Sequence, residues 1–382
     1  METIRKYEYE LDVGCRSATL AQCTGIFDTQ DGRTGFLRPF STEMKPSRDD
    51  SLVPPSVSLT NRLRNGVVVQ GECSRTPKGI QLTAVETVND LPVAEWRKVG
   101  DFDSLTPIHP HEQIVLEPCA GSPSMRVIDL IAPIGKGQRA LIVSPPRAGK
   151  TRLITQMAEA VSQHHPDMRL VVLLLDERPE EVTEMVRAVK GQVFASSSDQ
   201  DARNHVRLAR LALDYAKRWA EAGADVMLLL DSLTRLGRSS NLMQTGPGRT
   251  LSGGVDTRAL EWPRRIFGAA RESEEAGSIT IVATALVETN SRMDDFIYED
   301  FKGTGNCEIV LRRDLAEQRI FPAIDVRQSG TRNEELILGD KTARHHKLRR
   351  ILYDLSPAEA MKALLKLVGN SESNRDLLAS LG

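Results

Sequence analysis

The chain has 382 residues, a formal net charge of −2 and a hydrophobic content of 40%. This length leaves room for two or three domains, and the composition excludes a disordered or fibrous protein. No apolar stretch approaches the ~20 residues of a membrane-spanning helix, and the first residues lack the apolar centre of a signal peptide, so we expect a cytoplasmic protein.

The cysteines are scattered along the chain and form no C-x-x-C pair. We interpret them as reduced thiols, and this spacing argues against a structural zinc site. The five are Cys15, Cys23, Cys73, Cys119 and Cys307.

The first hundred residues contain short β-leaning segments separated by turn-rich clusters. The clearest segments are ATLAQCTGIFD, TGFLRPF, NGVVVQGEC and IQLTAVETV. Several short strands at this spacing predict a small β-barrel or sandwich over residues 14–100, after a short lead of residues 1–13. Residues 101–124 are predicted to be a connector, and we interpret its histidines as part of a solvated linker rather than as metal ligands.

From residue 125 onward, continuous apolar runs alternate with amphipathic stretches. The runs are ALIV, LVVLLL, VMLLLD and ITIVATAL, which are typical of strands buried on both faces. Residues 152–163 form one of the amphipathic stretches, with an apolar face of Leu153, Ile154, Met157, Ala158 and Val161. Two more are EEVTEMVRAVK and HVRLARLALDYAKRWAEA. The alternation predicts an α/β core with a largely parallel sheet over residues 125–340.

Residues 341–382 are predicted to form a C-terminal helical part of the core domain. The stretch SPAEAMKALLKL opens with Ser356, Pro357 and Glu359. This pattern predicts a capping box with proline at the first helical position.

The stretch LIVSPPRAGKT, residues 141–151, joins a predicted buried strand to an amphipathic helix. That is the setting of a phosphate-binding loop, in which backbone N–H groups of the loop and of the helix N-terminus bind the anion. We expect Lys150 to reach the β- and γ-phosphates of a nucleotide and Thr151 to hold Mg²⁺. The usual first glycine of this loop is Ser144 here, which is also small.

Two other apolar strands end in acidic residues, Asp231 and Glu177. Ligands bind at the carboxyl ends of the strands in a parallel sheet. We therefore expect Asp231 to hold Mg²⁺ together with Thr151, and Glu177 to orient and polarise the attacking water. The simpler alternatives are that Asp231 caps a helix and that Asp176 and Glu177 only begin one.

Long stretches of this sequence resemble the family of transcription termination factor Rho. They are GQRALIVSPPRAGKT, VVLLLDERPEEVTEM, LLLDSLTRLGR, LSGGVD, FGAARESEEAGSITIVATAL, YEDFKGTGNCEIVL and FPAIDVRQSGTR. The resemblance is nearly unbroken over residues 105–332 and looser over the first hundred. It implies a RecA-like ATPase core, preceded by a small OB or cold-shock-like RNA-binding β-barrel. It also implies a homohexamer that hydrolyses ATP to move along single-stranded RNA and terminate transcription, with RNA polymerase and elongation factors as partners.

The resemblance also assigns nucleotide-site roles. It implies that Arg332 is an arginine finger acting on the neighbouring subunit's ATP and that Arg319 is a second arginine at that interface. Phe321 matches the aromatic that stacks on adenine, and Arg152 stands where the residue on the other side of the ring is expected. Without the match, these arginines would be interpreted as solvated surface residues. The ATP-binding residues are then Gly135, Lys136, Gly137, Gln138, Arg139, Ala140, Arg147, Ala148, Gly149, Lys150, Thr151, Arg152, Arg178 and Phe321.

The RNA-binding residues are also implied by the resemblance, in a barrel strand and in two pore loops. They are Phe36, Arg38, Arg249, Thr250, Leu251, Ser252, Gly253, Gly254, Arg292 and Lys302. The barrel departs from the family, because Arg33 and Thr34 stand where an aromatic is expected and Leu52 where a tyrosine is expected. We therefore predict that the isolated barrel binds single-stranded RNA weakly, mainly through phosphates and with little pyrimidine preference.

Two other functions stay open on the sequence alone. The same core fits a hexameric rotary or secretion-type ATPase, and an RNA-binding protein can use ATP only as an assembly switch. The barrel and the pore loop argue against the first alternative, and Glu177 and Arg332 argue against the second. RNA-stimulated ATPase activity separates all three.

Overall fold

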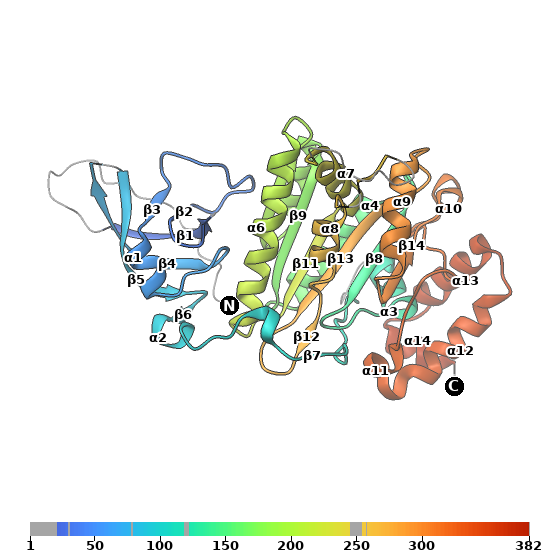
Figure 1. Cartoon of the computed structure of the whole chain (residues 1–382). Coiled ribbons are helices and arrows are strands. Elements are labelled where there is room, and N and C mark those ends of the chain that lie inside the picture. The colour runs from blue at the N-terminus through green and yellow to red at the C-terminus, as the bar shows by residue number, and fades with distance from the viewer. Residues whose placement is uncertain are drawn as a thin grey trace.

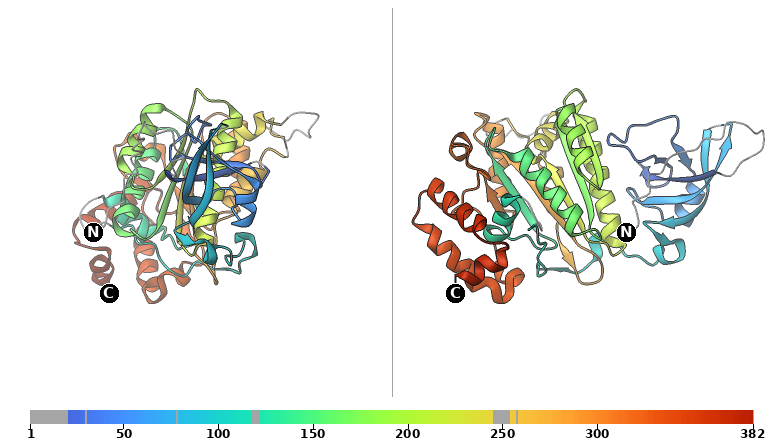
Figure 2. Two further views of the ribbon diagram at one scale, coloured as in Figure 1. Left: turned by 90° about the vertical axis from the view of Figure 1, so that its left-hand side faces the viewer. Right: turned by 180° about the vertical axis from the view of Figure 1, so that it is seen from behind.

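The computed structural model describes residues 21–29, 31–77, 79–117, 122–244, 254–256 and 258–381. A β-barrel lies at one end, the α/β core in the middle, and a group of C-terminal helices at the other end (Figure 1). Figure 2 shows the same arrangement from behind. In these described residues, no helix is both long enough and apolar enough to span a bilayer.

The barrel forms from the segments that the sequence predicts to be strands. Its strands are ordered β3-β2-β1-β4-β5, and a pairing of β3 with β5 closes it. Their side chains alternate, so that in β2 Phe36 is exposed while Leu37 joins a core with Phe27 and Leu82. The strands are β1 (Ala21–Thr29), β2 (Gly35–Arg38), β3 (Ser51–Val53), β4 (Val68–Thr76) and β5 (Gly79–Val88), with β6 (Leu91–Pro92) added to β5. The prediction of a small barrel is confirmed.

Two cysteines of the barrel correct the prediction of reduced thiols. Cys23 of β1 and Cys73 of β4 form a disulfide, with their Cα atoms 6.0 Å apart. The antiparallel register places Cys23 opposite Gly71 on the neighbouring strand, which brings two residues 50 positions apart within reach of each other. Sequence spacing alone does not reveal such a register. Cys307 is a buried free thiol, and Cys15 and Cys119 lie outside the described residues.

The core contains a seven-stranded sheet in the order β10-β9-β11-β13-β8-β14-β15. Every neighbouring pair is parallel except β14 with β15, which confirms the predicted α/β class. Its strands are β8 (Arg139–Ser144), β9 (Arg169–Glu177), β10 (Gln192–Ser197), β11 (Val226–Asp231), β13 (Ile279–Leu286), β14 (Cys307–Val310) and β15 (Gly330–Thr331).

Helices cover both faces of this sheet in two separate apolar clusters. One face carries α3 (Pro123–Ile131), α4 (Lys150–His164) and α5 (Pro179–Ala188); the other carries α6 (Ala202–Glu221), α7 (Leu233–Leu242), α8 (Glu261–Phe267) and α9 (Arg292–Lys302). The five predicted apolar positions of α4 are all buried. The barrel packs on the second cluster, because Ile26, Met44 and Val68 belong to it.

The C-terminal helices extend the first face of the core. They are α11 (Glu334–Leu338), α12 (Thr342–Tyr353), α13 (Pro357–Gly369) and α14 (Asn374–Ser380), and α10 (Arg313–Glu317) precedes them. The predicted capping box is present, since Ser356 and Glu359 each bond the other's backbone N–H. The connector contains β7 (Pro107–Ile108), which pairs with β12 (Glu272–Ser273).

Candidate nucleotide site

Three predicted site residues meet at the carboxyl edge of the core sheet. Lys150 begins α4 just after the loop that follows β8, and Glu177 and Asp231 end β9 and β11. The Lys150 Nζ lies 2.5 Å from Asp231 Oδ1 and 3.4 Å from Glu177 Oε1. Both carboxylates are buried, and this ammonium is the cation that they share.

The loop before α4 has the backbone of an anion-binding turn. Arg147 and Gly149 adopt positive φ angles of 66° and 93°, and Gly149 caps the helix without a side-chain bond. The first N–H groups of α4 are therefore left for a ligand. A Cβ atom at Gly149 would lie 3.5 Å from Phe321 Cε1, so the ring of Phe321 lies against the loop. Phe321 is 40% exposed, so part of its ring is accessible beside the loop.

Two residues that the sequence analysis missed complete this cluster. Arg235 of α7 donates from Nη2 to Glu177 at 3.3 Å and lies 3.3 Å from Asp176 through Nη1. Thr284 of β13 donates to Asp231 Oδ1 at 2.9 Å. The sequence did carry weak signals: Arg235 follows Asp231 by four residues, and Thr284 is a polar residue inside the apolar run ITIVATAL.

The surroundings of Glu177 prepare it to accept a proton. Burial and the negative charge of Asp231 raise its pKa to about 7, although Lys150 and Arg235 pull it down. A carboxylate with a pKa near the working pH is well matched to general-base catalysis. The same burial makes its protonation state depend on the cations around it.

We expect kcat/KM for ATP to rise with pH through about 7, because Glu177 must be deprotonated to act as a base. Arg235→Ala removes a positive charge that favours the carboxylate, so the midpoint should move to higher pH. Arg235→Lys keeps the charge and should return the midpoint toward the wild-type value. A pH profile of ATP turnover measures the midpoint for the wild type and for both variants. An Arg235→Ala midpoint that stays in place or falls would contradict this role.

The cluster also contains oxygen ligands of the kind that Mg²⁺ prefers. The Thr151 hydroxyl lies at the start of α4, 3.5 Å from Glu181 Oε2, and Asp231 supplies a carboxylate. Among the described residues, no group of three or more histidine, cysteine, aspartate and glutamate side chains could hold a metal ion. Mg²⁺ commonly binds through one or two protein oxygens together with nucleotide phosphates, and Thr151 and Asp231 could supply two such oxygens.

The other predicted ATP-binding residues divide between the two ends of the strands. Arg147, Arg152 and Arg178 are exposed around the phosphate loop, and Ala148 is buried within it. The predicted stretch Gly135–Ala140 lies instead at the amino end of β8. The five residue steps from Arg139 to Ser144 span roughly 17 Å, and the loop begins only after them. Strand β8 separates the two, so within one chain this stretch and the phosphate loop lie at opposite ends of the strand. ATP binding by the stretch stays a prediction.

Arg332 lies at this same amino edge. It follows β15, and its backbone N–H donates to Asn306 O at 2.8 Å, while the Gln138 side chain donates to the Asn306 side chain at 2.8 Å. A cavity of about 380 Å³ opens beside it. Arg319 is exposed two residues before Phe321, on the side of the phosphate loop. Within one chain, Arg332 therefore lies at the opposite end of the strands from the phosphate loop.

The predicted RNA-binding residues differ in exposure, and some of them lie outside the described residues. Phe36 is exposed on β2, whereas Arg38 is only 8% exposed and its guanidinium pairs with Asp28 and Asp50. An RNA contact by Arg38 stays a prediction, and it would require these ion pairs to open. Arg292 and Lys302 are exposed at opposite ends of α9. Gly254 is described, with φ +78°, whereas the predicted pore-loop residues 249–253 lie outside the described residues.

Residues 124–331, more than half of the chain, match the nucleotide-binding domain of the ATP synthase alpha/beta family. A solved ATPase from the type III secretion system of pathogenic bacteria matches with a TM-score of 0.61 at 23% identity, over 73% of this chain and 86% of that one. At that identity the likeness shows the fold alone. Fold and site together define a RecA-like, ATP-binding and ATP-hydrolysing enzyme.

Curated relatives then identify the family. The chain is 48% identical to transcription termination factor Rho of Streptomyces coelicolor, over 93% of this chain and 84% of that protein. It is 47% identical to the Rho factor of Chromobacterium violaceum, over 91% of this chain and 85% of that protein. It spans only 52% of the Streptomyces lividans Rho, to which it is 46% identical. This chain belongs to the Rho family, and the relatives do not support the secretion-type alternative.

Proposed function

We propose that this protein is an ATP-driven RNA translocase that terminates transcription by moving along nascent RNA as a homohexamer. The observation that carries the proposal is the placement of the phosphate loop and Arg332 at opposite edges of one sheet. In a ring of identical subunits, Arg332 can then complete only a neighbour's ATP site. Such an arrangement makes ATP hydrolysis in one subunit depend on the position of the neighbouring subunit that supplies Arg332.

Each side chain of the cluster has a distinct task in hydrolysis. The loop and the first turn of α4 hold the phosphates, and Lys150 shifts from Asp231 toward them when they arrive. Glu177 orients the attacking water and accepts its proton. Mg²⁺, held by Thr151 and Asp231, would neutralise phosphate charge. Phe321 and Arg152 flank the adenine ring.

The amino edge has a second set of tasks in the ring. Gly135–Ala140 and Arg332 share that edge, which supports a contribution of both to the neighbouring subunit's nucleotide. Arg319 would join the same interface from the loop side. In the central pore, Arg292, Lys302 and residues 249–254 would contact RNA phosphates. RNA polymerase and elongation factors are the expected partners of such a translocase.

The proposal predicts that ATP turnover depends on single-stranded RNA. Glu177→Gln should keep ATP binding, because the cradle is spared, but lose at least about 100-fold in turnover when its carboxylate is removed. The measurements are ATP turnover with and without single-stranded RNA, and nucleotide binding by the variant. ATP turnover indifferent to RNA would contradict the translocase, and a variant unable to bind ATP would contradict the role of Glu177.

A further inference from the structure

Three exposed phenylalanines stand out on this protein. All nine phenylalanines lie within the described residues, and Phe36, Phe40 and Phe321 are the ones whose side chains are at least 40% exposed. Phe321 lies against the phosphate loop, and Phe36 is on the predicted RNA-binding strand. Phe40 has no role in the function proposed above, although it is 41% exposed, as much as Phe36.

Phe40 lies in a bend just beyond β2, which ends at Arg38. Side chains alternate along a strand, so Phe36 and Arg38 lie on the side opposite Leu37, which is buried in the barrel core. Phe40 follows two residues beyond Arg38. Four residue steps separate the two rings' Cα atoms, at most about 14 Å apart.

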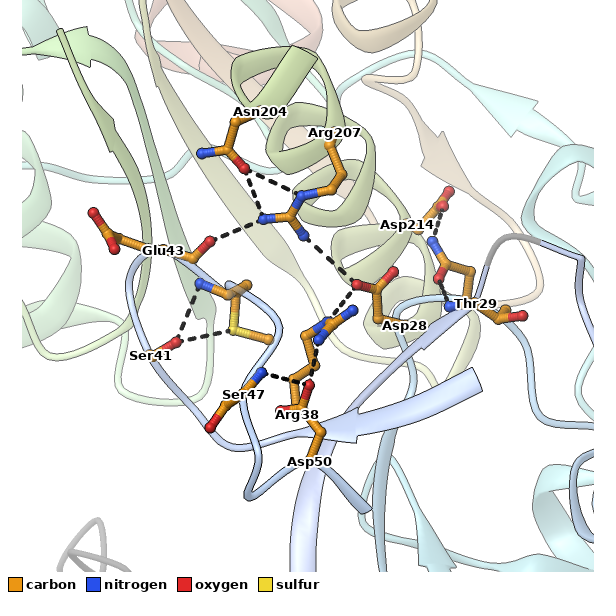
Figure 3. Close-up of polar contacts among 12 residues, drawn as sticks. Asp28, Thr29, Arg38, Ser41, Glu43, Ser47, Asp50, Asn204, Arg207 and Asp214 are labelled. Carbon is orange, nitrogen blue, oxygen red and sulfur yellow. Dashed lines mark hydrogen bonds and ion pairs between the residues drawn. The ribbon is translucent and has the colours of Figure 1, made fainter. Parts of the chain in front are cut away.

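The arginine between these rings is already neutralised. Arg38 Nε lies 2.5 Å from Asp28 Oδ2, and its Nη1 lies 2.5 Å from Asp50 Oδ2 (Figure 3). Arg207 of the core helix α6 approaches Asp28 Oδ2 at 3.6 Å. Two carboxylates thus hold the guanidinium of β2 away from phosphates. The groups that this segment exposes to a ligand are therefore the rings of Phe36 and Phe40.

The backbone on the other side of Phe40 is fixed to the core. The Ala195 N–H of β10 donates to Thr42 O at 2.8 Å, and Arg207 Nη2 donates to Glu43 O at 3.0 Å. Ser41 Oγ accepts the Met44 N–H at 3.1 Å, and Met44 is fully buried in the apolar cluster that includes α6. Phe40 is therefore an exposed ring between two anchored points, so binding a ligand costs little ordering of the backbone.

We propose that Phe40 stacks on a nucleobase and that Phe36 and Phe40 form a two-ring platform for single-stranded RNA. The proposal rests on the proposed RNA-binding function and names the residue that compensates for the aromatics absent at Thr34 and Leu52. Stacking on aromatic rings tolerates any base, because every base has a π-face. It also depends less on salt than phosphate binding does. The barrel then binds RNA more through bases than the sequence alone predicts.

The test uses the full chain and fluorescently labelled oligocytidylate and oligoadenylate. Phe40→Ala should weaken binding about 5- to 100-fold for both, with the salt dependence unchanged. Phe40→Tyr keeps the ring and should restore affinity. Leu59→Ala is the matched control, since Leu59 is 59% exposed on α1 (Pro55–Thr60) of the same barrel. Neither exposed truncation should lower the unfolding temperature.

A second readout reports on the barrel separately from the pore. In Phe40→Trp, the added indole fluorescence should be quenched when the oligonucleotide binds, in excess of any change in the wild type. Wild-type affinity in Phe40→Ala and no such quenching would overturn the role of Phe40 while leaving the translocase proposal intact. Loss of ring assembly with unchanged oligonucleotide affinity would assign Phe40 to a protein interface and would also overturn it. A wild-type chain that binds neither oligonucleotide would instead overturn the RNA-binding function itself.

Discussion

Lys150→Ala is expected to reduce ATP turnover at least about 100-fold, the effect of removing one well-placed electrostatic group from an active site. Lys150 is the cation at the start of α4, 2.5 Å from Asp231 and 3.4 Å from Glu177. The variant loses the group that reaches the phosphates. It also leaves two buried carboxylates without their shared partner, which should raise the pKa of Glu177 further and remove the base at neutral pH.

The loss must be separated from unfolding, because an unpaired buried charge can cost about 3–5 kcal/mol. Thermal unfolding of Lys150→Ala and Lys150→Gln should accompany the turnover assay. Lys190→Ala, at an exposed lysine after α5, is the matched control and should retain wild-type activity. A folded Lys150→Ala enzyme with wild-type turnover would refute the phosphate-loop assignment.

The second large effect is expected at Arg332, whose removal should cost on the order of 10³–10⁵ in kcat, as for arginine fingers in other phosphoryl-transfer enzymes. Its backbone lies at the amino edge of the sheet, held to Asn306 O at 2.8 Å, while the phosphate loop lies at the carboxyl edge. Arg332 should therefore act on the ATP of the next subunit.

A mixing experiment tests this action in trans. Neither Arg332→Ala nor Lys150→Ala rings should be active alone. Mixed rings again contain sites with an intact loop beside an intact arginine, so part of the activity should return. Arg344→Ala, at an exposed arginine on α12, should leave activity unchanged as the control. No recovery at any ratio, with mixed rings shown to form, would refute the trans assignment.

Local patterns in the sequence determined the core strands, the buried face of α4 and the position of the nucleotide site. The apolar runs predicted strands β8, β9, β11 and β13, because strands buried on both faces need apolar side chains on both. The 3.6-residue spacing predicted the buried face of α4. The loop and the two strand-end acids predicted the site, since a parallel sheet brings the carboxyl ends of its strands to one edge.

Tertiary structure alone decided the features that depend on partners distant in the chain. Arg38 looks like an RNA ligand in the sequence, yet Asp28, Asp50 and, from α6, Arg207 surround it in space. Arg235 and Thr284 reach the catalytic carboxylates only because α7 and β13 lie beside β9 and β11. The barrel register pairs Cys23 with Cys73, which lie 50 positions apart in the chain. Propensity and spacing act over a few residues, whereas charge pairing, strand register and edge position are set by contacts between segments tens of residues apart.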